Sequence, residues 1–235
     1  MLKSAAIIFH PVHKYLCAGF VIIRYMFNGV NRVVKVMVVA DFFYNSAFAS
    51  FGPVFAIFIT NQIAGGSAKV AGFAAAIYWI VKSICQLPIA RFLDKTDGER
   101  DDFLALFLGY FLSGLVPLAY IFAREPKHLY IIQAFYGFVM AWAVPAWYSI
   151  FTRHVDKWRI SFEWSLDSVF SVGVAASISA ALGGYIAERF GFAILMVIAS
   201  TLSIFSAFLL LGLANHLSPR RKEQRVIPDR NLPKF

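Results

Sequence analysis

The chain has 235 residues, of which 60% are apolar and 15% charged, and its mean hydropathy is +0.67. Ordinary soluble domains are about 45–50% apolar, so this composition excludes that class and indicates a membrane protein. The net charge of +9 would also suit a nucleic-acid-binding protein, but the basic residues cluster at the ends of apolar segments, so we expect lipid headgroups and no nucleic acid as partners.

Six apolar segments of 20 to 24 residues follow one another along the chain. A membrane-spanning helix needs about 17–25 residues, whereas the strands of a membrane barrel have about ten residues and alternate strictly. The sequence therefore predicts an all-α integral membrane protein with six transmembrane helices. The expected spans are residues 36–59, 70–93, 103–122, 129–151, 168–187 and 192–214.

Two terminal segments, residues 1–32 and 218–235, lie outside the predicted transmembrane domain of residues 33–217. In the first, the apolar run 15–27 is too short to span a membrane, and it predicts a helix lying in the interface. Alternatively, the true start is Met26 and the residues before it have little structural role. The second is basic and contains prolines without apolar periodicity, so we expect it to be disordered and close to anionic membrane lipids.

The positive charges predict the orientation. Outside the spans, only Lys69, Arg124, Lys127 and Arg189 lie on one side of the membrane, and the other Lys and Arg residues lie on the opposite side. Because positive residues stay on the cytoplasmic side, both termini are expected in the cytoplasm and the protein in the cell (inner) membrane.

Two ionisable residues lie inside predicted spans, where a charge costs about 2.5 kcal/mol or more at the bilayer centre and marks a candidate functional site. Asp41 shares one helical face of the first span with polar and aromatic neighbours, and Lys82 does the same in the middle of the second. We predict that both faces line a water-filled cavity that binds a substrate or ion. The alternatives are an Asp41–Lys82 ion pair that locks two helices, or a snorkelling Lys82 and an interfacial Asp41. The candidate residues are Asp41, Tyr44, Asn45, Tyr78, Lys82 and Gln86.

An internal repeat places further candidates on the fourth span. A shift of 92 residues aligns Phe43, Tyr44, Ala49 and Pro53 with Phe135, Tyr136, Ala141 and Pro145. Because the first and fourth spans run in opposite directions, the alignment predicts an inverted 3+3 repeat. Gln133 then corresponds to Asp41, and Gln133, Tyr136 and Trp142 join the candidate binding residues. Packing against lipid or neighbouring helices explains the aromatic residues equally well.

Enzyme chemistry lacks support in the sequence. The five histidines lie outside the predicted spans, and no Ser and His face each other within them. We therefore expect no enzyme, no metal and no cofactor.

The turn between the second and third spans carries a small residue, an acid, a base, a glycine and a base, and the fifth span carries a Gly-Gly pair. The turn residues are Ala90, Asp94, Lys95, Gly98 and Arg100, and the pair is Gly183 and Gly184. Over residues 33–214 these motifs, the helix count and the repeat resemble the major facilitator superfamily of secondary transporters. The resemblance implies one six-helix half built from a 3+3 inverted repeat, alternating access for a small organic solute, and a homodimer of such halves.

The resemblance also implies that the turn residues form a cytoplasmic gate. Glu163 and Asp167, four residues apart before the fifth span, would extend it by pairing with Arg91, Lys95 or Arg153. Alternatively, the two acids only cap a helix and face solvent. The charges of the turn would then serve only to fix the orientation of the protein in the membrane. The candidate gate residues are Arg91, Asp94, Lys95, Gly98, Arg100, Glu163 and Asp167. A non-transporting membrane adaptor or a lipid scramblase remains the alternative function.

Overall fold

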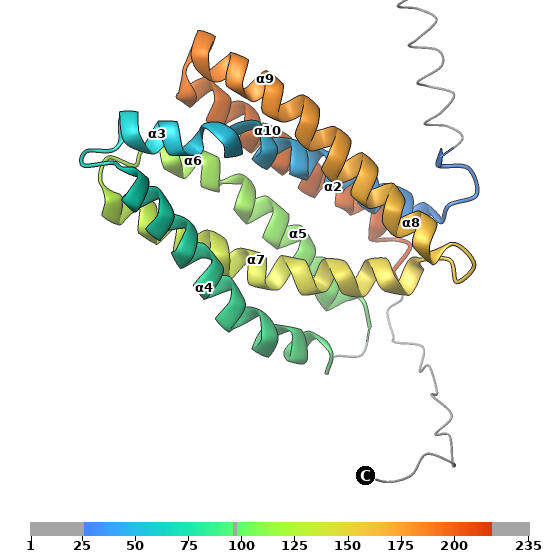
Figure 1. Ribbon diagram of the computed structural model, residues 1–235. Helices are drawn as coiled ribbons and strands as arrows, with labels where there is room; N and C mark the ends of the chain where they lie inside the picture. Colours follow the sequence, from blue (N-terminus) through green and yellow to red (C-terminus); the bar gives the residue numbers. More distant parts are fainter. Residues whose placement is uncertain (1–25, 96–97, 218–235) are drawn as a thin grey trace, which may run out of the picture.

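The fold is described from a computed structural model, which describes residues 26–95 and 98–217. The predictions for the N-terminal segment up to residue 25 and for the tail from residue 218 lie outside these residues. All regular structure in the described part is helical, as predicted (Figure 1).

Six stretches of helix are long and apolar enough to cross a membrane, and each overlaps one of the six predicted segments. They are Arg32–Gln62, Ala68–Leu93, Arg100–Ile121, Pro126–His154, Ile160–Phe190 and Phe192–Leu213. In the first, fifth and sixth spans the helix type changes along the span, and Leu115 divides the third span into two α-helices. The helices in chain order are α2 (Arg32–Phe51), η1 (Gly52–Val54), α3 (Phe55–Gln62), α4 (Ala68–Leu93), α5 (Arg100–Gly114), α6 (Val116–Ile121), α7 (Pro126–His154), α8 (Ile160–Leu166), η2 (Asp167–Val174), α9 (Ala175–Phe190), α10 (Phe192–Leu210) and η3 (Leu211–Leu213).

Local sequence signals set several helix ends. The side chain of Asn31 accepts a hydrogen bond from the backbone N–H of Val33 at 2.9 Å, and that of Ser67 accepts one from Val70 at 3.3 Å. Both satisfy a backbone donor in the first turn of a helix. Gly191, with φ +87°, separates α9 from α10, and Pro53 falls in η1, where the first span changes from α to 3₁₀ winding.

Buried serines join the last span to its neighbours. Ser200 and Ser206 of α10 donate hydrogen bonds of 2.6 Å to the backbone oxygens of Gly114 and Ala40, respectively. In the fifth span, Ser171 donates to the oxygen of Val38 at 2.9 Å. These bonds satisfy the hydroxyl groups inside the bundle and hold α10 and η2 against α2.

Two glycines allow helix backbones to touch. A methyl group placed on Gly183 of α9 would lie 1.8 Å from the backbone oxygen of Ser50 in α2. One placed on Gly137 of α7 would lie 2.6 Å from the backbone oxygen of Tyr78 in α4. Only hydrogen fits in either place, so glycine is what brings α9 onto α2 and α4 onto α7.

The fifth span contains a segment of wider helical winding. Between α8 and α9, the eight residues of η2 form a π-helix, in which backbone hydrogen bonds join residues five apart instead of four. Asp167 is its first residue.

The six spans differ in how much of their surface the bundle covers. In the most apolar part of α4 only 11% of the residues are buried, and in the fifth span 17%, against 44% for α7 and 50% for the third span. The second and fifth spans therefore offer most of their apolar surface to lipid or to another protein.

Candidate functional site

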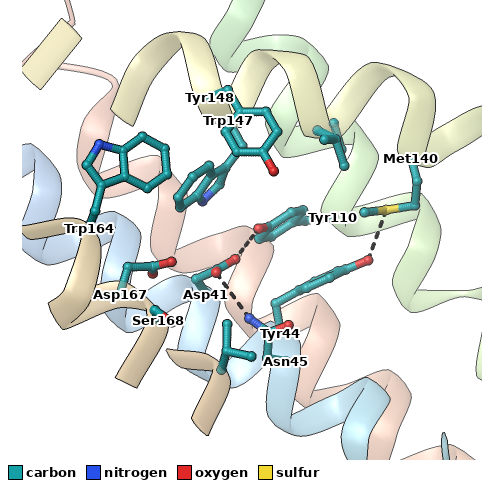
Figure 2. Close-up of a pocket in the computed structure, with 13 residues that line it drawn as sticks. Asp41, Tyr44, Asn45, Tyr110, Met140, Trp147, Tyr148, Trp164, Asp167 and Ser168 are labelled. Atoms are coloured by element: carbon teal, nitrogen blue, oxygen red, sulfur yellow. Dashed lines mark hydrogen bonds between the residues drawn. The ribbon is translucent and has the colours of Figure 1, made fainter. Parts of the chain in front are cut away.

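A cavity of about 370 Å³ opens between four spans, and we name it the Asp41 cavity. Figure 2 shows the side chains around it. The first and third spans contribute Asp41, Tyr44, Asn45 and Tyr110. The fourth and fifth contribute Met140, Ala143, Val144, Trp147, Tyr148, Trp164, Asp167, Ser168 and Val172. A few polar groups among apolar and aromatic walls are typical of a small-molecule site.

Hydrogen bonds hold Asp41 in place on one wall. Its two carboxylate oxygens accept bonds from the hydroxyl of Tyr110 and from the side-chain amide of Asn45, the latter at 3.1 Å (Figure 2). The ring of Tyr110 stacks on that of Tyr44 with centroids 4.0 Å apart, and the Tyr44 hydroxyl donates to the sulfur of Met140 at 3.0 Å. The carboxylate is thus fixed by side chains from two helices.

Other polar atoms in the wall lack such bonds. Asp167 is 7% exposed and Trp147 is 8% exposed, yet the Oδ1 atom of Asp167 and the indole Nε1 of Trp147 have no hydrogen-bond partner. A buried polar group without a partner costs about 1–3 kcal/mol. Both atoms can therefore still form a hydrogen bond with a ligand in the cavity.

The structure separates the predicted binding residues into two groups. Asp41, Tyr44 and Asn45 lie together in the cavity wall, but none of the α4 candidates lines it. No ion pair joins Asp41 to Lys82 in the described residues; the Lys82 ammonium lies 4.8 Å from the ring centroid of Trp79 instead. Trp79 is exposed. The interpretation of Asp41 and Lys82 as a locking pair is therefore wrong.

Aromatic contacts connect the remaining candidates. Tyr136 stacks on Tyr78 with ring centroids 4.7 Å apart, and its hydroxyl lies 3.4 Å from that of Tyr44. Trp142 packs edge-on against Phe92. Gln133 is buried and Gln86 half-buried, and neither lines the cavity.

A charge network closes the end of the bundle that carries the turn between α4 and α5. The guanidinium of Arg153 lies 2.8 Å from the carboxylate of Asp102 and also donates to the backbone oxygen of Gly98 at 3.4 Å. Ser149 donates to the same carboxylate at 2.8 Å, and Glu99 lies 3.9 Å from Arg153. We name Arg153, Asp102, Glu99, Ser149 and the Gly98 carbonyl the Arg153 network.

This network differs from the predicted gate. Of the predicted residues, only Gly98 belongs to it, through its carbonyl, whereas Arg91, Asp94, Lys95 and Arg100 are exposed. The two predicted acids are elsewhere. Glu163 is buried and accepts a bond from the backbone N–H of Asp156 at 3.1 Å, and Asp167 lines the cavity. Within the described residues, no ion pair joins either acid to Arg91, Lys95 or Arg153, so that predicted extension of the gate is wrong.

Sequence reasoning did not select Tyr110, Trp147 and Trp164 for the cavity or Asp102 for the network. The three aromatic residues resemble ordinary span residues, and nothing in a single sequence separates them from lipid-facing ones. Asp102 did carry a signal, because an acid at the start of one span and a base, Arg153, at the end of the next lie at the same membrane surface. In the residues that the structure describes, no cluster of three or more His, Cys, Asp or Glu could hold a metal ion.

Comparison with known proteins agrees with the helix arrangement. A search of curated proteins finds no match. The family model described as Major Facilitator Superfamily matches residues 37–234, which is most of the chain and overlaps every span. Members of this family are membrane transporters, and six helices form one half of such a transporter. The chain belongs to the major facilitator superfamily, as an integral membrane protein with the six helices of one transporter half.

Proposed function

We propose that the chain is a secondary active transporter that moves a small organic solute by alternating access, with the Asp41 cavity as its solute site. The observation that carries the proposal is the cavity itself, which places two buried carboxylates among aromatic side chains inside a transporter fold. A membrane adaptor has no need of a buried cavity with acidic side chains at this place, and a parallel assay tests the scramblase alternative below.

The working unit in this proposal is a homodimer. Transporters of this family combine two six-helix halves around one path. The second and fifth spans have little buried surface within the unit, and α4 carries the half-buried Lys82 in its middle. A charged side chain facing hydrocarbon is costly, so a second copy that covers α4 would give Lys82 a wetter environment.

The Arg153 network would act as a gate at the cytoplasmic surface. The distribution of Lys and Arg predicts that this end of the bundle faces the cytoplasm. The network connects the α4–α5 turn, the start of α5 and the end of α7, so that breaking it would release those elements from one another. Asp94, Lys95 and Arg100 are exposed in or beside the same turn.

Substitution of Asp41 tests the transport function. Solutes that bind are first found as those that raise the melting temperature of the purified protein. We expect Asp41→Asn to lower vesicle uptake of such a solute at least tenfold, because the amide keeps the size but removes the charge. Lipid scrambling serves as the parallel assay. If no solute crosses the membrane and scrambling is present and unchanged by Asp41→Asn, the scramblase alternative replaces the transporter.

Mass measurement tests the dimer. We expect native mass spectrometry of the protein in lipid nanodiscs to show two copies, since the exposed spans bury their surface only in the pair. Trp79→Arg, at an exposed position of α4 one helical turn from Lys82 and on the same face, should increase the monomer fraction through repulsion between the copies. Leu108→Arg, at an exposed position of α5, is the matched control. A monomer that still moves solute would refute the dimer.

A further inference from the structure

The Asp41 cavity has two acidic side chains in its wall and, among the described residues, no basic one. Asp41 lies on α2 and Asp167 on η2, and both line the cavity at 8% and 7% exposure. Among the described residues that line the cavity, none is Lys, Arg or His. Buried charges are costly unless a partner of opposite sign lies beside them. A positively charged ligand supplies that partner, whereas an anion would be repelled.

The two carboxylates differ in how many hydrogen bonds they already accept. Each oxygen of Asp41 already accepts one hydrogen bond, from Tyr110 or Asn45. In contrast, the Oδ1 atom of Asp167 has no hydrogen-bond partner among the described residues. Figure 2 shows the two carboxyl groups on the same side of the cavity. A cation between them would accordingly donate its main hydrogen bond to Asp167 and gain a charge contribution from Asp41.

The walls suit the body of an organic cation. Trp147, Tyr148 and Trp164 line the side opposite Asn45, and the rings of Trp147 and Trp164 meet edge to face with centroids 5.8 Å apart. The faces of Trp and Tyr attract ammonium groups, and the attraction strengthens when water is excluded. A small inorganic ion would leave this aromatic surface unused.

Trp147 gives a second and independent indication of a ligand. Its indole N–H is a hydrogen-bond donor, is buried and is unpartnered. In Figure 2 its nitrogen is turned toward the side of the cavity where Asp41 and Asp167 lie. A cationic group cannot accept this bond. The ligand should therefore carry an acceptor, such as a hydroxyl or carbonyl oxygen, in addition to its charge.

We propose that the Asp41 cavity selects an organic monocation, an amine with its nitrogen held between Asp167 and Asp41, its body against the tryptophans and an acceptor group for the indole of Trp147. This inference rests on the transport function proposed above and specifies its substrate class. The cavity volume of about 370 Å³ limits the ligand to a small molecule.

Three probes of similar shape and different charge test the selectivity. Tyramine is a cation with a phenolic oxygen, 4-ethylphenol is its neutral relative, and 3-(4-hydroxyphenyl)propionate is an anion. We expect tyramine to raise the melting temperature of the full chain in nanodiscs and to bind, by calorimetry, at least tenfold more tightly than the other two. A panel of larger and N-methylated tyramines covers ligands of other sizes in the same assay.

Two substitutions locate the interactions. Asp167→Asn should weaken the binding of tyramine at least tenfold and leave the binding of 4-ethylphenol unchanged. Trp147→Phe should weaken the binding of tyramine more than that of phenethylamine, which lacks the phenolic oxygen. The difference between these two changes in affinity measures the hydrogen bond from the indole. Glu188→Gln, which removes an exposed acid of α9, is the control and should change the binding of neither amine. Size-exclusion profiles identify variants that fail to fold, which are then excluded from the comparison.

The outcomes separate this inference from the proposed function. If a neutral or anionic solute binds in an Asp41-dependent way and is transported while every amine of the panel fails to bind, the cation assignment is overturned and transport stands. If amines bind equally well to the parent and to Asp167→Asn, the cavity assignment is overturned. If nothing binds and nothing is transported, both proposals fall.

Discussion

Gly183→Val should prevent α9 from packing on α2 and leave little monodisperse protein. A side chain at this position would begin 1.8 Å from the backbone oxygen and 2.5 Å from the backbone carbon of Ser50. Because these atoms belong to the backbone of α2, the clash can be relieved only by moving a whole span. Overpacking a core costs about 1–3 kcal/mol and occasionally more, and we expect this substitution at or above the upper end of that range.

The measurement is the size-exclusion profile followed by thermal unfolding in nanodiscs. The neighbouring residue provides a close control, because nothing lies within 4 Å of a methyl group placed on Gly184. Gly184→Val should therefore retain the parent profile and most of its melting temperature. Equal behaviour of the two valine variants would show that α2 and α9 do not approach as closely as described.

Arg153→Met should destabilise the protein by about 3–5 kcal/mol, the range for removing one partner of a buried ion pair. Asp102 is only 1% exposed, and Arg153 is the basic partner of its carboxylate. Methionine keeps the length of the side chain and removes its charge. The remaining bond from Ser149 cannot balance a buried negative charge. Equilibrium unfolding in mixed micelles gives the change in free energy.

A second substitution separates charge from packing. Adding Asp102→Asn to Arg153→Met removes the unbalanced carboxylate and should recover a large part of the lost stability. The exposed pair Lys127–Glu125 is the matched control, with an equally close contact of 2.7 Å at 67% and 51% side-chain exposure. The hydrogen bond and charge of Lys127 lower the pKa of Glu125, but both groups are solvated, so Lys127→Met should leave unfolding unchanged. Failure of the double variant to recover would mean that Arg153 acts mainly through packing.

The sequence predicted the architecture well because hydrophobic length is a strong local signal. All six spans follow from it, and the family follows from the loop and Gly-Gly motifs together with the helix count. The inverted repeat stays a prediction. The contact between the hydroxyls of Tyr44 and Tyr136, which are 92 residues apart, is consistent with it, since equivalent positions meet near a twofold axis.

The candidate site was predicted only in part, and the reasons differ between residues. Asp41 was found because a charge inside an apolar run is conspicuous. Asp167 was assigned to the gate because Glu163 and Asp167 made the fifth apolar run look as if it began at residue 168, whereas the helical span begins at Ile160. Lys82 was assigned to a polar helical face, but a helical pattern does not show which neighbour that face meets. In the structure the backbone of α4 at Tyr78 packs against α7, and Lys82 does not line the cavity.

The loosely wound stretch of the fifth span has a consequence for how the site can change shape. In an α-helix each residue adds a rotation of about 100°, so rewinding Asp167–Val174 from π to α geometry would shift the register by one residue and turn the segment before it by a comparable angle. Asp167 would then leave its place beside Asp41 without any bending of the rest of the helix. Of the two acids in the cavity wall, the one with an unpaired oxygen thus lies on the segment whose helical winding can tighten.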